Sequence, residues 1–305
     1  MGFDSAYEAI TEDLDDHRWA FGTGFDDPLK GVDTSLPVGV DGGDLGAYCL
    51  MLGDDALIMS HRLQQWLTRA PELEEETALA NIALDLLGQA RLLLSRAGAA
   101  DGTGRSEDDY AYLREEPEFR NVGLVEGIDE DFGALQARLL VFSSWRLALM
   151  ARLRASRDPV LAAIAENAVK ELTYHREYAA DWVIRLGDGT AYSHARVTAG
   201  LAALAPITGE LFDISDIEQR LTQQTVAVDP ALLREEVSEV LADVLARAGL
   251  GGPGGAELGV LDRADPAGAV GAARLRGRAG VHTAALGPLL AELQSVARTH
   301  PGATW

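Results

Sequence analysis

Histidine and carboxylate side chains at helical spacing are the residues of this sequence that could bind a metal. A di-iron site in a four-helix bundle takes a Glu from each of two helices and a Glu-x-x-His pair from each of two others, because an i, i+3 spacing points both ligands inward. The residues three positions before the six histidines are Leu14, Ile58, Leu172, Ala191, Ala279 and Ala297. None of them is acidic, so the sequence contains no such pair.

The nearest approach to a metal site is His175, which lies on the apolar stripe of a predicted helix beginning at Pro159. Leu172 stands where a carboxylate ligand would be needed, whereas Glu171, four residues before His175, could still meet the imidazole through an ion pair or a hydrogen bond. A core-facing histidine beside a carboxylate is more often structural than metal-binding. The predicted helix before it has no Asp or Glu from Phe132 to Ser156, so one wall of the supposed site has no ligand.

Other catalytic patterns are weaker. Ser143 and Ser144 have no histidine nearby in the sequence and no Gly-x-Ser-x-Gly turn. The glycines at 249–255 follow a predicted helix and precede no Lys-Ser or Lys-Thr, so a phosphate-binding loop is not indicated. Cys49, the single cysteine, lies in an apolar helical context and is expected to be a buried structural thiol.

The elements that would position these residues are helices. Apolar residues recur at 3.6-residue spacing, and Asp158–Pro159 and Asp229–Pro230 each read as an N-cap followed by proline. Long helices are predicted over 46–68, 71–96, 131–156 and 159–187, with a short helix over 106–115 and further helices over 193–213, 216–224, 229–248 and 282–299. We expect an all-α, ferritin-like four-helix bundle with additional C-terminal helices.

Composition and charge limit the function. Residues 1–43 are expected to form an acidic, loosely ordered extension, residues 44–305 the helical domain, and residues 249–280 a Gly- and Ala-rich loop. With 48 acidic against 26 basic residues the formal charge is −22, which disfavours nucleic acid and anionic membranes as partners. The lone cysteine, with no signal peptide or membrane span expected, indicates a cytoplasmic protein.

Several stretches in order along the chain carry a family resemblance. They are Leu52–Asp55, Ser60–Leu63, Ala78–Arg91, Ser156–Pro159, Lys170–Glu171, Tyr174–His175, Arg185–Asp188, Glu210–Asp213, Ala227–Pro230, His282–Thr283, Leu286–Pro288 and Pro301–Trp305. Here the sequence resembles the PaaC family, the structural subunits of the phenylacetyl-CoA 1,2-epoxidase complex of aerobic phenylacetate catabolism. The resemblance runs from about Tyr48 to the last residue.

The resemblance implies a non-catalytic role. The related catalytic subunits carry Asp-Glu-Leu-Gly-His in their second long helix, where this sequence has Asp85, Leu86, Leu87, Gly88 and Gln89. Leu86 therefore replaces a metal-binding Glu, and Gln89 replaces a His. By resemblance we expect no catalytic residue, metal or cofactor in this chain. The implied partners are a di-iron catalytic subunit that binds the CoA thioester, a reductase that uses NADPH, and small accessory subunits.

Two alternatives remain open from the sequence. One is a self-sufficient di-iron or di-manganese oxygenase with an unusual ligand set such as Asp85, Glu171 and His175. The other is a helical interaction module unrelated to oxygenation. The missing carboxylate–histidine pairs argue against the first, and the extended resemblance argues against the second.

Overall fold

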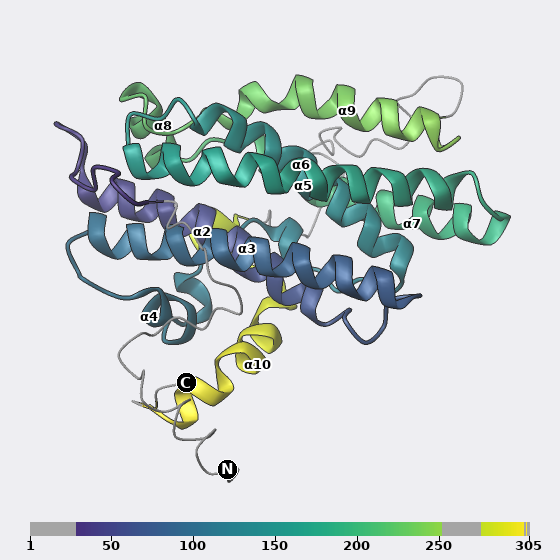
Figure 1. Ribbon diagram of the computed structural model, residues 1–305, viewed down its shortest axis with the longest axis horizontal. Helices are drawn as coiled ribbons and strands as arrows, with labels where there is room; N and C mark the ends of the chain where they lie inside the picture. Colours follow the sequence, from purple (N-terminus) through teal and green to yellow (C-terminus); the bar gives the residue numbers. More distant parts are fainter. Residues whose placement is uncertain (1–28, 252–275, 302, 304–305) are drawn as a thin grey trace, which may run out of the picture. The chain divides into compact units, whose positions relative to one another are not determined.

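A computed structural model describes residues 29–251, 276–301 and 303. The chain divides into two units, Met1–Gly31 and Val32–Trp305, and the second contains all the helices described below. Four long helices form its centre: α2 (Gly42–Gln64), α3 (Leu73–Ala100), α5 (Phe132–Leu153) and α6 (Pro159–Gly187). Helix α2 packs mainly on α3, α5 packs on α6, and α3 joins the two pairs by packing on α6 (Figure 1). The predicted four-helix bundle is confirmed.

Additional helices surround this bundle. They are α4 (Glu107–Tyr112), α7 (Ala191–Thr208), α8 (Asp216–Gln223), α9 (Arg234–Arg247) and α10 (Leu286–Thr299). Helices α7 and α9 pack on α5 and α6, α4 packs on α3, and α10 packs on α4 (Figure 1). No β-strand occurs within the described ranges; Val226–Val228, the best strand pattern in the sequence, follows a turn in which the Val226 amide donates to the Leu221 carbonyl.

The predicted apolar stripes face the core. On α3, the stripe residues Leu79, Ile82, Ala83, Leu86, Ala90 and Leu93 are all buried. On α5, Leu135, Leu139, Phe142, Leu149 and Leu153 are buried as well. Cys49 is buried as predicted, and burial raises the pKa of its thiol, which makes it unreactive.

Several predicted boundaries were wrong for identifiable reasons. Helix α3 begins at Leu73, after Pro71, and continues past Gly98 to Ala100. Gly98 is buried because the main chain of Arg105 crosses it, where a Cβ would collide with the Arg105 carbonyl. Asp229–Pro230 opens a 3-10 turn over Pro230–Leu233, and α9 follows it.

The boundary expected at residue 43 falls inside α2. Asp41 caps that helix by accepting a hydrogen bond from the Asp44 amide at 2.9 Å. The segment before it is also attached, because Arg96 donates to the carbonyl of Thr34 at 2.6 Å. The short helix that the sequence suggests around Tyr7–Trp19 lies outside the described residues, as do residues 252–275 of the predicted loop.

The end of the predicted loop is an anchored segment. Arg278 is held by Asp55 of α2, with Nη2–Oδ2 at 2.8 Å and Nη1–Oδ1 at 3.0 Å. Gly277 lies against the Asn121 carbonyl, where a Cβ would not fit. Helix α10 begins at Leu286, later than the predicted His282, because His282 and the Thr283 amide are both bonded to Glu126.

His282 is a histidine of this segment whose buried side chain lies between two acceptors. Its Nδ1 lies 2.7 Å from Glu126 Oε1 and its Nε2 lies 3.1 Å from the Phe119 carbonyl. Both partners are acceptors, so this geometry favours the ring that carries a proton on each nitrogen. Burial lowers the pKa of His282, but the hydrogen bonds and charges of Glu126, Phe119 and Glu116 outweigh it and raise the pKa above its ordinary value.

We predict that His282→Gln destabilises the protein most at low pH. A raised folded pKa means that the stabilisation is complete below the unfolded value of about 6.5 and is lost as pH rises through the folded pKa. The loss in unfolding free energy should be about 3 kcal/mol at pH 6 and should shrink toward pH 9. Urea unfolding of both proteins across this range tests it, and a loss that grows with pH would contradict a protonated His282.

Candidate functional site

The side chains at the expected metal positions meet between α3 and α6. His175 Nε2 lies 2.9 Å from Asp85 Oδ2, and Gln89 donates from Nε2 to Glu171 Oε2 at 2.8 Å. Each pair joins one residue of α3 to one of α6. The structure therefore brings together four of the polar residues that the sequence analysis singled out.

The pairing differs from the one suggested by spacing. Glu171 is four residues from His175 on the same helix, but it bonds to Gln89, and Asp85 takes the imidazole. The His175 side chain is 1% exposed and that of Asp85 is 37% exposed. Because a carboxylate accepts, Nε2 of His175 is the protonated nitrogen. The other nitrogen, Nδ1, is buried and has no hydrogen-bond partner among the described residues.

Leucines occupy two of the expected ligand positions and fill the centre of the bundle with apolar side chains. Leu86 and Leu172 are both fully buried, three residues before Gln89 and His175 respectively. A leucine offers no oxygen to a hard cation. In the part of the chain that the structure describes, no three His, Cys, Asp or Glu side chains gather closely enough to bind a metal. The residues present at the centre do not fit a di-iron group.

Arg146 of α5 is the central residue that the sequence analysis missed. It is fully buried; its Nε donates to Gln89 Oε1 at 3.0 Å and its Nη1 donates to the Leu52 carbonyl at 3.2 Å. The apolar stripe of α5 holds the signal that could have found it. Arg146 lies between Phe142 and Leu149 at the same 3–4-residue spacing, so a charged residue occupies a core-facing position.

Burial sets the electrostatics of this centre. It lowers the pKa of Arg146 to about 10, partly offset by the charges of Asp55 and Glu171, so the guanidinium stays charged at neutral pH. Burial also raises the pKa of Glu171, against the hydrogen bond from Gln89, while the neighbouring Asp85 raises it further. The site therefore holds a positive charge that Asp55 of α2 and Glu171 of α6 partly balance.

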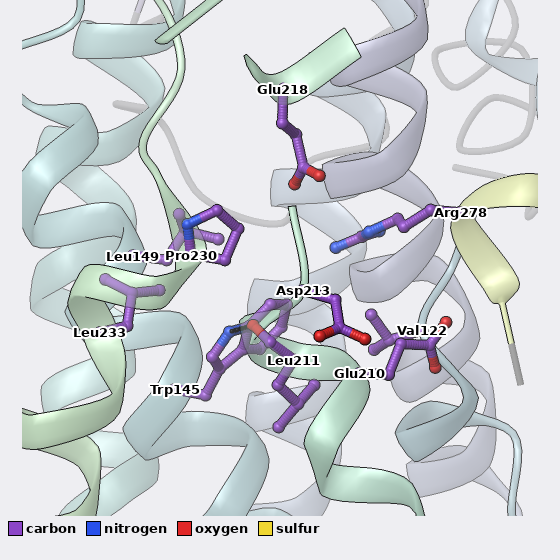
Figure 2. Close-up of a pocket in the computed structure, with 10 residues that line it drawn as sticks. All are labelled: Val122, Trp145, Leu149, Glu210, Leu211, Asp213, Glu218, Pro230, Leu233 and Arg278. Carbon is purple, nitrogen blue, oxygen red and sulfur yellow. Dashed lines mark hydrogen bonds between the residues drawn. The ribbon is translucent and has the colours of Figure 1, made fainter. Parts of the chain in front are cut away.

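A small cavity lies elsewhere in the bundle, on the side of α5 that carries Trp145. Figure 2 shows the carboxylates of Asp213 and Glu218 and the guanidinium of Arg278 turned toward it. Its volume of about 10 Å³ is room for at most one water molecule, too small for an organic substrate.

A wider groove of about 400 Å³ runs between α6 and α9. Its charged lining consists of Arg176, Glu177, Glu239, Asp243 and Arg247. Acidic side chains outnumber basic ones there, and Arg247 lies 3.5 Å from Asp243. A groove with this charge does not favour the phosphates of a CoA thioester.

Comparison with known proteins places the chain in a family. A model of the phenylacetic acid catabolic protein family matches residues 41–305. The chain belongs to this family. It is also 42% identical over 262 residues to the C subunit of the 1,2-phenylacetyl-CoA epoxidase of Escherichia coli strain K12. That match covers 86% of this chain and 99% of the relative.

The family match agrees with the observed architecture. The predicted all-α, ferritin-like fold is confirmed, and so is the resemblance to the PaaC family. The match begins at residue 41, next to the first residue of α2, so the family region and the helical bundle start together.

We predict that Gln89→Leu destabilises the protein by roughly 2–4 kcal/mol. Gln89 is 4% exposed and its loss leaves both Arg146 Nε and the Glu171 carboxylate without a partner. Denaturant unfolding measures the loss. Gln64→Leu is the matched control, because Gln64 is exposed at the end of α2 and should change stability by less than about 0.5 kcal/mol. Equal effects of the two substitutions would contradict a central role for Gln89.

Proposed function

We propose that this chain is a non-catalytic subunit of a phenylacetyl-CoA 1,2-epoxidase that binds and stabilises a related di-iron catalytic subunit in phenylacetate catabolism. The observation that carries the proposal is the match to the C subunit of the Escherichia coli enzyme, which extends over almost all of that relative. A bundle centre built from Leu86, Leu172 and Arg146 supports the non-catalytic part.

The partners that we propose for this chain are inferred from the same resemblance. The partners would be the di-iron subunit that binds the CoA thioester, a reductase supplying electrons from NADPH, and small accessory subunits, in the cytoplasm. This chain would hold no metal and no cofactor of its own. The self-sufficient oxygenase is disfavoured because His175 pairs with Asp85 while Glu171 pairs with Gln89 beside a buried cation.

A surface on α3 and α6 suits a helical partner. Leu84 is 61% exposed and Tyr174 is 49% exposed. Leu84 precedes Asp85 and Tyr174 precedes His175, and the Asp85–His175 contact joins α3 to α6. We call Leu84, Gly88 and Tyr174 the α3–α6 face. Among the described helices, α3 is the one that is long and apolar enough to cross a membrane. It packs along α2, but only 44% of its most apolar stretch is buried within this chain. A partner helix packed on the α3–α6 face would cover Leu84 and Tyr174.

We predict that the chain alone does not oxygenate phenylacetyl-CoA, with or without the reductase. Mixing it with the di-iron subunit should give a stable complex on size-exclusion chromatography and restore turnover, with the iron assigned to the partner by analysis of the separated subunits. A permanent contact of this kind should bury on the order of 2,000 Å². Turnover by this chain alone, or full activity and solubility of the partner without it, would refute the proposal.

We also predict that Leu84→Arg weakens association with the di-iron subunit by tenfold or more, since a charge would be buried in an apolar contact. The melting temperature of the isolated chain should stay within about 2 °C, because Leu84 is mostly exposed. Leu232→Arg is the matched control: Leu232 is 63% exposed but lies in the turn Pro230–Leu233, before α9. Calorimetric titration distinguishes the two, and equal affinities would place the contact elsewhere.

A further inference from the structure

The centre of this bundle contains a cation that belongs to the protein itself. Carboxylate-bridged metal sites in ferritin-like bundles lie where side chains from four helices converge. Here the convergent side chain of α5 is Arg146, which is fully buried. A guanidinium is permanently charged and directs N–H donors outward in a plane, so it repels a metal ion and bonds to the same oxygen atoms that a metal would attract.

We propose that the guanidinium of Arg146 takes the place of a metal as the central charge that holds the four bundle helices together. Nη1 donates to the Leu52 carbonyl of α2, and Nε donates to Gln89 Oε1 of α3. Gln89 in turn donates a hydrogen bond from Nε2 to Glu171 Oε2 of α6. Arg146 itself belongs to α5, so one continuous set of hydrogen bonds joins α2, α3, α5 and α6.

Gln89 is the residue type that this connection requires. Its amide accepts from Arg146 through the oxygen and donates to Glu171 through the nitrogen. A carboxylate at this position could only accept and would repel Glu171, while a lysine could only donate and would repel Arg146. The sequence analysis treated glutamine in place of a metal-binding histidine as the loss of a ligand. In the structure this glutamine forms a new interaction with the cation of α5.

This assignment is independent of the proposed complex, because it concerns only the isolated chain. The full-length protein should melt at the same temperature before and after dialysis against EDTA and should take up no iron from added ferrous salt. A fall of several degrees on chelation would overturn the proposal, since the bundle would then depend on a bound metal.

The charge is tested by three substitutions in the full chain. Arg146→Met keeps most of the side-chain volume but removes the cation, and the melting temperature should fall by roughly 10 °C, because a buried polar network loses one partner. Arg146→Lys should lose less. Arg152→Met, on the same helix, is the control: Arg152 is 35% exposed and paired with Glu236 at 2.6 Å, so its loss should shift melting by less than about 4 °C.

Two further measurements separate charge from packing. Arg146→Met/Glu171→Gln should melt several degrees above Arg146→Met, because the first change removes the cation that balances the charge of Glu171 and the second removes that charge. The deficit of Arg146→Met should also shrink as pH falls, because burial raises the pKa of Glu171, loss of the cation raises it further, and the protonated carboxyl no longer needs a balancing charge. If the single variant does not fold, the double variant and Arg146→Lys still should. A double variant no more stable than the single one, or a deficit independent of pH, would leave packing as the only role of Arg146.

Discussion

Buried charge is the constraint on which this bundle depends. Asp54 and Asp55 are neighbours on α2, and both are completely buried. A buried carboxylate is costly unless it is paired with a cation and hydrogen-bonded. Asp54 is paired with Arg114, 60 residues later, and Asp55 with Arg278, 223 residues later. Two adjacent acids of one helix thereby fix both the segment before α5 and the segment before α10 against the bundle.

Buried ion pairs also connect other elements of the structure. Arg96 of α3 is paired with Asp158, the N-cap of α6, and both side chains are almost completely buried. Arg138 of α5 is paired with Asp129 at 2.8 Å. Burying such a pair gains little net stability compared with apolar packing, but removing one partner is costly. These pairs therefore act mainly by excluding alternative arrangements in which a charge would lie buried alone.

The sequence predicted what depends on local pattern. Helix types and apolar faces follow from 3.6-residue spacing, so the stripes of α3 and α5 and the proline-initiated start of α6 were read correctly. Spacing of i, i+4 places Glu171 and His175 on one face of their helix, whereas Asp85 and Gln89 were singled out by the family resemblance. Local spacing could not say which residue pairs with which, since that depends on the rotation of α3 against α6.

The misses share one cause, which is dependence on contacts outside the helix or segment that carries the residue. Helix α10 begins late because Glu126, 156 residues before His282, takes the histidine and the following amide. Helix α3 extends beyond the predicted residue 96 to Ala100, and Gly98 within it leaves room for the main chain of Arg105. Arg146 was overlooked because charged residues are usually solvated, and only the position of Leu52 and Gln89 shows that this one is not.

Loss of a metal site need not leave a bundle with a weaker centre. A metal orders four helices through bonds of fixed direction, and a core refilled with leucine alone would keep the volume but not the directions. Leu86 and Leu172 supply that volume here, while Arg146 and Gln89 supply direction through donors and acceptors on four helices. Arg146 also interacts through charge with Asp55, which holds Arg278. The centre of the bundle and the anchored C-terminal segment therefore belong to one electrostatic network. Each buried charge in this network is stabilised by the opposite charge beside it.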